Sequence, residues 1–485
     1  MEDKKIRVYH THIEVSPYTQ GENPKIERYL SIWLESEHCY DPYGYYIEDD
    51  VLYLPRGYNV YVLEKEFESS AFYVRRADKS EHIKEQIHML GKPRDRIQEE
   101  SINFLSCKKN FKKVGKYSQQ ALILDTGDGK TFTTVYSILQ YRLRAIIITH
   151  QEKIKKQWIE TFKKYTDIDE DKLINIGNSN DMLRVIKGKK EGYMYFINHQ
   201  TINSCARLHG WNTVREFFKE TGAGIKVFDE AHLSFKNVLR VDMFSNTEKT
   251  FYLTANFGRS DIKEQMLFKK CFASVYKFGE ETRDYEEKRK QIIYVPVLYR
   301  SNATFSDINM ATNVYGFSVL KFSEYALHRD EDKTMIRHFY HVFDIATKLE
   351  GKILITVPKI DDTEFIKECI KKEYPDLEKS VSTINSKNTK EENSLAKDSD
   401  IICSTIKSCG TGVDIKGLRC IINMEPFNSS ITANQLSGRL REYAKDKDTY
   451  FFDMIDISFP SCERQYQSKL EFLRKKCKEI KVMRL

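Results

Sequence analysis

Residues 229–232 read DEAH and place two carboxylates and an imidazole directly after a short apolar run. The run predicts a buried parallel strand that ends at the two acids. Ligands of open α/β sheets bind at that edge. Asp229 could there hold Mg²⁺ through its water shell, while Glu230 polarises the water that attacks a γ-phosphate. A helix cap or a solvated turn is the alternative interpretation of such a pair.

A glycine-containing turn lies upstream, in the stretch ALILDTGDGKT at residues 121–131. It joins a predicted strand to a predicted helix, so its backbone N–H groups could surround a phosphate while the helix N-terminus faces the phosphate charge. Lys130 would reach the β- and γ-phosphates, and the Thr131 hydroxyl would ligate Mg²⁺. The ATP-binding residues predicted from this turn are Thr126, Gly127, Asp128, Gly129, Lys130 and Thr131. Together with residues 229–232, they predict a site that binds and hydrolyses ATP.

Strands and helices alternate around these two motifs, which predicts a parallel, right-handed α/β sheet. Polar residues at the strand ends would share one edge with the ATP site, where a nucleic-acid backbone could lie across them. The candidate nucleic-acid contacts are Thr149, His150, Asn198, His199 and Gln200, together with Gln157 on the basic helix predicted over 152–165. Simple loop polarity is the alternative. Gln98, one helix before the phosphate loop, could present a donor and an acceptor to the adenine edge.

A second α/β series begins after residue 300, with strands predicted at 350–358 and 399–405. The glycines of residues 409–415 permit a tight backbone, and Asp414 is placed for a ribose hydroxyl or an inter-domain contact. Arg439, on a helix predicted over 435–442, has the character of a phosphate-seeking arginine. Residues 463–485 hold eight basic and three acidic side chains at helical spacing. This helix is either a solvated docking helix or a nucleic-acid contact.

Composition places the protein among ordinary folded chains. It has 485 residues, of which 40% are hydrophobic and 31% charged, enough for two or three domains. No apolar run approaches the roughly 18–20 residues that span a bilayer, and the N-terminus lacks the apolar core of a secretion signal. The ten cysteines form no CxxC pair. We therefore expect reduced cysteines, no membrane association and a cytoplasmic location, the host cytoplasm if the gene belongs to a phage.

Charge is unevenly distributed along the chain. The net charge is +7, yet residues 1–85 contain 11 Lys/Arg and 17 Asp/Glu, which leaves the remaining 400 residues at +13. A polyanionic partner for the body of the protein is the expectation, and lysine used for solubility is the alternative. The many aromatic residues of 1–85 recur at strand and helix periods, which favours a core role over a base-stacking platform. The acidic balance also argues against this segment as the main phosphate-binding region.

These patterns predict four parts. Residues 1–88 form a small α+β domain that is acidic and rich in tyrosine, and that could bind a protein partner. Residues 89–280 and 281–458 form two tandem parallel-sheet α/β domains, the first of which binds ATP. Residues 459–485 form a basic C-terminal helix. We expect a monomer.

The motifs occur in the order found in superfamily 2 helicases and translocases, which the chain resembles over roughly 94–445. The resemblance implies two RecA-like domains with ATP between them and a nucleic-acid strand lying across both. Within the superfamily, the Gln157–Trp158 pair and the small N-terminal domain are most similar to phage UvsW-type branch-migrating helicases and to related helicases of large DNA viruses. Departures occur at Asn256, where Thr is usual, and at Glu442, where a second arginine is usual. Arg441 could replace that arginine from the neighbouring position.

The resemblance also implies residue roles. Lys130, Asp229 and Glu230 would bind and hydrolyse ATP, and Arg439 would be an arginine finger that stabilises charge on the transferring phosphoryl group. The residues that would couple nucleotide state to domain closure are His232, Thr254, Ala255, Gly412 and Gln435, with Gln435 also catalytic and Thr405 a nucleic-acid contact. ATP and Mg²⁺ are the implied cofactors, and single-stranded or branched DNA is the implied partner.

The sequence thus predicts an ATP-dependent DNA helicase or translocase that remodels branched or displaced-strand DNA in recombination, replication or repair. One alternative is a transcription-linked helicase that releases RNA from a template. Another is an ATP-gated scaffold or loader without significant turnover.

Overall fold

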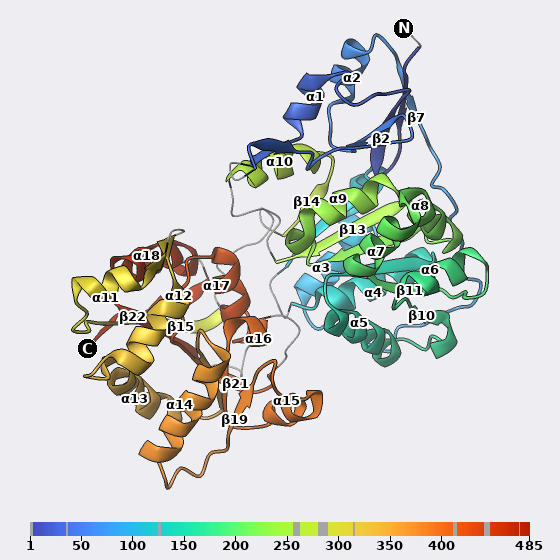
Figure 1. The fold of residues 1–485 in the computed structure, drawn as a ribbon. Coiled ribbons are helices and arrows are strands. Elements are labelled where there is room, and N and C mark those ends of the chain that lie inside the picture. The colour runs from blue at the N-terminus through green and yellow to red at the C-terminus, as the bar shows by residue number, and fades with distance from the viewer. Residues whose placement is uncertain are drawn as a thin grey trace. The chain divides into compact units, whose positions relative to one another are not determined.

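The protein forms two compact units, residues 1–282 and 283–485. The computed structural model describes residues 3–34, 37–124, 128–255, 262–279, 290–313, 316–410, 415–440, 447–474 and 476–485. Each unit contains a parallel sheet with helices packed on it, and the first unit also carries a small N-terminal sheet (Figure 1). The predicted fold class, two tandem RecA-like parallel-sheet domains after a small α+β domain, is confirmed.

The larger sheet of the first unit has seven strands, and all neighbouring strands in it are parallel. Its inner strands are buried along their whole length because apolar residues point to both faces. In spatial order the strands are β10 (Leu173–Asn175), β11 (Met194–Asn198), β9 (Ala145–Thr149), β12 (Ile225–Asp229), β13 (Lys249–Thr254), β8 (Gln119–Ile123) and β14 (Tyr276–Phe278).

The register of these strands brings their carboxyl ends to one edge. Asn198 of β11 pairs with Thr149 of β9, and Thr254 of β13 pairs with Ile123 of β8. Because β12 lies between β9 and β13, its last residue, Asp229, stands in the middle of that edge.

The helices of the first unit follow the alternation that the sequence predicts. They are α3 (Arg96–Leu105), α4 (Lys130–Tyr141), α5 (Glu152–Tyr165), α6 (Ser179–Ile186), α7 (His199–His209), α8 (Trp211–Glu220), α9 (Phe235–Met243) and α10 (Ile262–Cys271), with short 3-10 turns at Lys109–Lys116, Glu170–Lys172 and Ala231–Ser234. Helices α4, α5 and α7 each follow a strand that ends at the site edge, so their first residues lie at that edge.

The N-terminal segment forms a separate five-stranded sheet. In spatial order its strands are β5 (Tyr46–Glu48), β6 (Val51–Pro55), β2 (His12–Ser16), β1 (Lys5–Val8) and β7 (Ala71–Tyr73), accompanied by α1 (Pro24–Tyr29), α2 (Val60–Glu66) and a hairpin of β3 (Ile32–Leu34) and β4 (Cys39–Asp41). Part of its aromatic content is core, as expected: Tyr18 and Tyr53 are buried. Tyr61, Phe72 and Tyr73, in contrast, are each more than half exposed.

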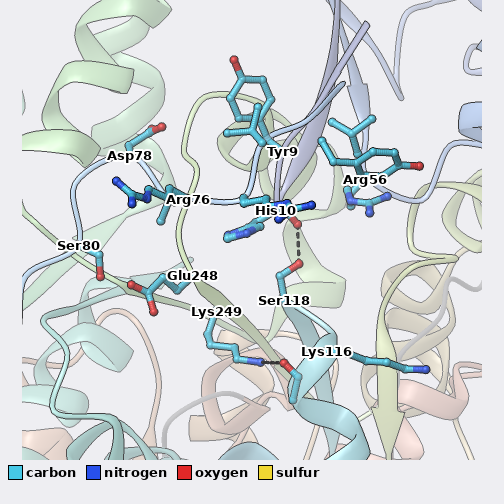
Figure 2. Close-up of a pocket in the computed structure, with 16 residues that line it drawn as sticks. Tyr9, His10, Arg56, Arg76, Asp78, Ser80, Lys116, Ser118, Glu248 and Lys249 are labelled. Atoms are coloured by element: carbon cyan, nitrogen blue, oxygen red, sulfur yellow. Dashed lines mark hydrogen bonds between the residues drawn. The ribbon is translucent and has the colours of Figure 1, made fainter. Parts of the chain in front are cut away.

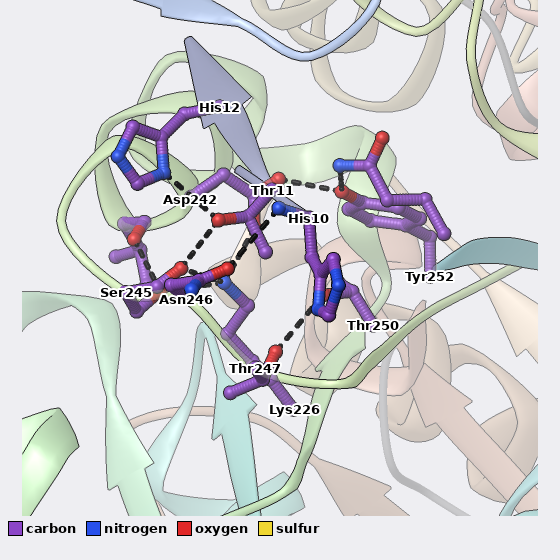
Figure 3. A network of polar contacts seen from close by, with 12 residues as sticks. His10, Thr11, His12, Lys226, Asp242, Ser245, Asn246, Thr247, Thr250 and Tyr252 are labelled. Atoms are coloured by element: carbon purple, nitrogen blue, oxygen red, sulfur yellow. Dashed lines mark hydrogen bonds and ion pairs between the residues drawn. The ribbon is translucent and has the colours of Figure 1, made fainter. Parts of the chain in front are cut away.

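A buried polar network joins this small sheet to the larger one (Figure 3). The Thr11 hydroxyl, in the turn between β1 and β2, donates to the carbonyl of Ser245 at 2.6 Å. The Lys226 ammonium donates to the Ser245 hydroxyl and forms an ion pair of 2.7 Å with Asp242. The N-terminal sheet is therefore fixed to the strand that carries Asp229.

The sheet of the second unit is also parallel throughout. In spatial order its strands are β19 (Val381–Ile384), β20 (Ile401–Ser404), β18 (Lys352–Thr356), β21 (Leu418–Asn423), β22 (Thr449–Asp456), β15 (Lys290–Tyr299) and β23 (Cys477–Ile480), with β24 (Met483–Arg484) also paired to β15. The prediction of one helix over 459–485 is wrong for the residues after 474. Helix α18 ends at Arg474, and the chain then adds β23 and β24 to the sheet because pairing with β15 satisfies their backbone groups.

The helices of the second unit are α11 (Phe305–Met310), α12 (Val319–Ser323), a π-helical turn (Glu324–Arg329), α13 (Thr334–Thr347), α14 (Ile360–Glu373), α15 (Lys390–Ala396), α16 (Ile406–Gly410), α17 (Ser430–Ser437) and α18 (Pro460–Arg474), with a hairpin of β16 (Thr312–Asn313) and β17 (Gly316–Phe317). All ten cysteines are free thiols, and seven of them are buried. In the described ranges, no helix has the length and apolar character needed to cross a membrane.

Candidate active site

Lys130 is the first residue of α4 and lies buried at the site edge. Its ammonium donates to the carbonyl of Leu124 at 3.0 Å and lies 3.8 Å from Glu230 Oε1. Gly129 before it has φ 86°, in the left-handed region that glycine adopts without steric cost. The turn thus delivers a cation and a helix N-terminus to the same place, which suits an anionic phosphate.

Gln98, on α3, contacts this turn directly. Its amide nitrogen donates to the carbonyl of Asp128 at 3.3 Å, and its amide oxygen accepts from the backbone N–H of Arg94 at 2.8 Å. A Cβ on Gly129 would lie 2.2 Å from the amide nitrogen of Gln98. Gln98 therefore braces the turn, and one amide hydrogen and one oxygen lone pair remain for an adenine edge.

Asp229 ends β12 and is buried. One of its carboxylate oxygens accepts from the indole N–H of Trp158 at 2.7 Å, and the other accepts from the backbone N–H of Glu230 at 3.0 Å. Burial, followed by the charge of Glu230, raises the pKa of Asp229 to about 6, although Trp158 and Lys130 act in the opposite direction. A divalent cation near such a carboxylate would lower its pKa, because the positive charge stabilises the ionised form.

Glu230 has a left-handed backbone, with φ 49° and ψ 49°. Such strain in a residue with a side chain is found mainly where a site depends on it. Its Oε2 atom is buried, makes no hydrogen bond within the described part of the chain, and lies 3.4 Å from His232 Nδ1. A buried carboxylate oxygen with spare acceptor capacity fits a water molecule or a ligand hydroxyl.

His232 and Thr254 connect β12 to β13. The Thr254 hydroxyl is hydrogen bonded to His232 Nδ1 at 2.8 Å, and both side chains are buried. The structure therefore brings together two of the residues expected to couple nucleotide state to movement. Ala255, the third of them in this unit, directly follows β13.

Two histidines complete the edge on the other side of Asp229. Both ring nitrogens of His150, and Nδ1 of His199, are buried without a hydrogen-bond partner among the described residues. Burial lowers the pKa of His150 and lowers that of His199 to about 3, so both imidazoles are neutral near pH 7. Unsatisfied buried polar atoms of this kind suit a ligand that is yet to bind.

The remaining candidate nucleic-acid contacts fall into two groups. Thr149 and Asn198 are buried and hydrogen bonded to each other at 2.6 Å, so they brace the ends of β9 and β11. Gln157 and Gln200 are exposed and could touch a ligand on the surface. Thr131, in the first turn of α4, is partly exposed beside Lys130 and could supply a hydroxyl to a magnesium ion, as Asp229 could supply a carboxylate.

Three of the predicted residues, Thr405, Gln435 and Arg439, lie in the described part of the second unit. The Thr405 hydroxyl accepts from the backbone N–H of Ser408 and so caps α16. Gln435 lies on α17. Arg439 was expected on the same helix, but α17 ends at Ser437, and Arg439 lies in the following turn, where its backbone N–H donates to Leu436.

Four predicted residues, Thr126, Gly127, Gly412 and Asp414, lie outside the described residues, as do Asn256, Arg441 and Glu442. Trp158 contacts Asp229 directly, although the sequence pointed to Trp158 only through the family resemblance. Sequence reasoning missed Glu152, which accepts from Asn198 at 2.8 Å and pairs with the buried Lys155. The signal for Trp158 was its position on the apolar face of α5, which also suits a purely structural residue.

Two protein-family models match the chain. Residues 83–259 match "Type III restriction enzyme, res subunit", and residues 333–442 match "Helicase conserved C-terminal domain". A search of curated proteins finds no match.

Several solved structures match the chain at low sequence identity. Dbp5 of S. cerevisiae, bound to RNA and ADP BeF3, is 15% identical with a TM-score of 0.50, covering 82% of this chain and 90% of its own. A fragment assigned as an HsdR subunit of a type I restriction enzyme from Vibrio vulnificus is 14% identical with a TM-score of 0.52, covering 80% and 68%. UvsW of T4 is 14% identical with a TM-score of 0.37, covering 99% of both chains. From the tandem order of the two matched domains, each on its own parallel sheet, we conclude that the chain belongs to the superfamily 2 helicases.

Proposed function

We propose that this helicase is an ATP-driven DNA helicase or translocase that remodels branched or displaced-strand DNA in recombination, replication or repair. The observation that carries the proposal is the position of Asp229 and Glu230 at the end of the central strand, with the Lys130 ammonium 3.8 Å from Glu230. The name of the matched family, a restriction enzyme subunit, favours DNA over RNA as the nucleic acid. The two alternatives, RNA release and an ATP-gated scaffold, become outcomes of the tests.

In the proposed mechanism, Lys130 binds the β- and γ-phosphates of ATP. Asp229 and Thr131 would hold the magnesium ion that arrives with the nucleotide, and this ion would neutralise charge on the phosphates. Glu230 orients the attacking water and receives its proton. The hydrogen bond between His232 and Thr254 transmits the state of the γ-phosphate to the strand ends beside it. Arg439 acts as the arginine finger, and Gln98 reads adenine.

Nucleic-acid stimulation of hydrolysis tests this function. Steady-state release of phosphate is measured without nucleic acid and with single-stranded DNA, blunt duplex, a four-way junction, single-stranded RNA and an RNA–DNA hybrid, at one moderate salt concentration because phosphate contacts are salt-dependent. We expect the largest stimulation with the junction or with single-stranded DNA. Stimulation by RNA or hybrid alone would instead support RNA release, and tight ATP binding without turnover would support the scaffold.

Trp158→Phe tests the environment of Asp229. The variant removes the hydrogen bond at 2.7 Å that helps to hold the pKa of Asp229 down, so that pKa should rise above about 6. Magnesium binds the ionised carboxylate. On acidification at subsaturating Mg²⁺, the variant should therefore lose activity at a higher pH than the wild type does. The variant should also need several-fold more Mg²⁺ than the wild type for half-maximal activity.

The pH profile of hydrolysis between pH 5 and pH 8, measured at several Mg²⁺ concentrations, checks this prediction. Trp33→Phe is the matched control, because Trp33 lies in the N-terminal segment and contacts Tyr40. If Trp158→Phe and Trp33→Phe gave superimposable profiles, the indole would have no role in holding Asp229.

A further inference from the structure

A cavity of about 570 Å³ lies between the N-terminal sheet and the larger sheet of the first unit (Figure 2). Its walls are the end of β1, Arg56 directly after β6, the end of β7 and the residues after it, and the segments that lead into β8 and β13. Ser118 precedes the first residue of β8, and Lys249 is the first residue of β13. The cavity therefore opens at the amino ends of the parallel strands, on the edge opposite to Asp229 and Lys130.

The charge of the cavity is opposite to that of the segment that forms most of it. Its lining contains five basic side chains and two acidic ones: Arg56, Arg75, Arg76, Lys116 and Lys249 against Asp78 and Glu248. Residues 1–85 carry six more acidic than basic side chains, yet three of their five arginines line this cavity. Positive charge is thus concentrated here against the trend of the whole segment.

Three of these five cations, the arginines, have no ion-pair partner among the residues that the structure describes. Lys249 makes hydrogen bonds within the protein: its ammonium donates to the carbonyls of Gly115 and Tyr117 at 3.1 and 2.7 Å. In the described part of the chain, no carboxylate lies within ion-pair distance of Arg56, Arg75 or Arg76. Arg56 is half-buried, and burial lowers its pKa because the guanidinium is partly desolvated. An anion in the cavity would offset that cost.

An aromatic ring stands beside these arginines. Tyr73, the last residue of β7, lines the cavity and is 52% exposed. Tyr9, which also lines the cavity, is braced by stacking on His12, with ring centroids 4.6 Å apart. Guanidinium groups next to an open aromatic face are the combination that binds single-stranded nucleic acid, because phosphates pair with the cations and bases stack on the ring.

We propose that this cavity is a second nucleic-acid site, in which a short run of a single strand places its phosphates against Arg56, Arg75 and Arg76 and stacks a base on Tyr73. This inference rests on the proposed function, since it assumes that the protein engages nucleic acid. It adds a contact on the edge of the sheet that faces away from the nucleotide. A strand held there would stay bound to the first unit regardless of the state of the ATP site.

Equilibrium binding of a fluorescein-labelled oligothymidylate of ~15 nucleotides to the full chain, without nucleotide and with a non-hydrolysable ATP analogue, tests the proposal. Arg75→Ala/Arg76→Ala should weaken binding by tenfold or more in both states. The slope of log K against log salt should become less negative by about 0.7 for each phosphate that the variant no longer neutralises. Tyr73→Ala should weaken binding about 5- to 150-fold with no change in that slope, because it removes stacking and no charge.

Lys65→Ala/Lys84→Ala is the matched control, since both lysines are exposed in the same segment and lie outside the cavity. It removes the same charge and should bind within twofold of the wild type. Tryptophan fluorescence and basal ATP hydrolysis verify that every variant is folded.

The outcomes separate this proposal from the proposed function. If the wild type binds the oligonucleotide and Arg75→Ala/Arg76→Ala binds like the lysine control, the cavity is not a nucleic-acid site, while the helicase function stands. If the wild type binds no nucleic acid in either nucleotide state, the proposed function itself fails. Displacement of the oligonucleotide by millimolar inorganic phosphate at constant ionic strength would overturn the strand site in favour of a free-anion site.

Discussion

Glu230→Gln is expected to lower the rate of ATP hydrolysis by about 10²–10⁴-fold while leaving ATP binding within a few-fold of the wild type. Glutamine has nearly the same shape as glutamate but cannot accept the proton of the attacking water. The loss should therefore appear in the chemical step and not in nucleotide affinity.

The geometry explains why no neighbouring group should replace Glu230. Asp229, the adjacent carboxylate, already accepts hydrogen bonds from Trp158 and from the backbone of Glu230. Glu230 directly follows the last residue of β12, and its Oε1 atom lies 3.8 Å from the Lys130 ammonium, which would bind the γ-phosphate. Glu230 is thus the carboxylate with both the position and the spare acceptor oxygen for water.

Single-turnover phosphate release and equilibrium binding of a fluorescent ATP analogue, measured on the same preparations, check this prediction. Glu160→Gln is the control, because Glu160 is exposed on α5 and the substitution removes the same charge. Retention of more than a tenth of the wild-type rate by Glu230→Gln would show that another group activates the water. Loss of ATP binding together with hydrolysis would assign Glu230 a structural role.

The edge of the sheet that carries the site could be predicted from sequence, because each apolar run that forms a strand ends there in a polar residue. Continuous apolar runs such as AIII at 145–148, alternating with helical segments, favour strands that are buried on both faces of a parallel sheet, and the polar residue that ends each run then lies at the carboxyl edge. The positions of Thr149, Asn198 and Asp229 follow from that rule and from register alone. The parallel-sheet fold and the position of the site at its carboxyl edge could thus both be predicted from short stretches of sequence.

Contacts between distant elements could not be predicted in the same way. The hydrogen bond between Trp158 and Asp229 joins residues on α5 and β12, and the contact of Gln98 with the phosphate-loop turn depends on how α3 packs. The end of the C-terminal helix at Arg474 could not be predicted, because helical spacing over 463–485 does not show that a further strand can pair with the edge of β15. Likewise, the overall acidity of residues 1–85 concealed the local cluster of arginines around the cavity.

Lys226→Met is expected to destabilise the first unit by about 3–5 kcal/mol, because it leaves the charge of a buried partner uncompensated. Lys226 is fully buried in β12, and its ammonium lies 2.7 Å from Asp242. Asp242 in turn accepts a hydrogen bond of 2.5 Å from Tyr252 on β13. The same ammonium donates to Ser245, whose carbonyl accepts from Thr11 of the N-terminal segment, so the loss should loosen both sheets together (Figure 3).

Tryptophan fluorescence during urea unfolding measures this effect selectively, because all three tryptophans, Trp33, Trp158 and Trp211, lie in the first unit. Lys219→Met, at an exposed position on α8, is the control and should change stability by no more than about 0.5 kcal/mol. Lys226→Met/Asp242→Asn should recover part of the loss, because a neutral amide leaves no buried charge and can still accept from Tyr252.

The dependence of stability on pH distinguishes a lost ion pair from lost packing. Burial already raises the pKa of Asp242 in the folded protein, and Lys226 acts in the opposite direction, so the folded-state pKa should rise further without Lys226. The folded state then binds the extra proton, so the Lys226→Met variant should be most stable at low pH and lose stability as the pH rises through that folded-state pKa. A deficit relative to wild type that is the same at pH 5 and pH 8 would mean that packing around the methylene chain of Lys226, and not its charge, holds β12 and the N-terminal sheet together.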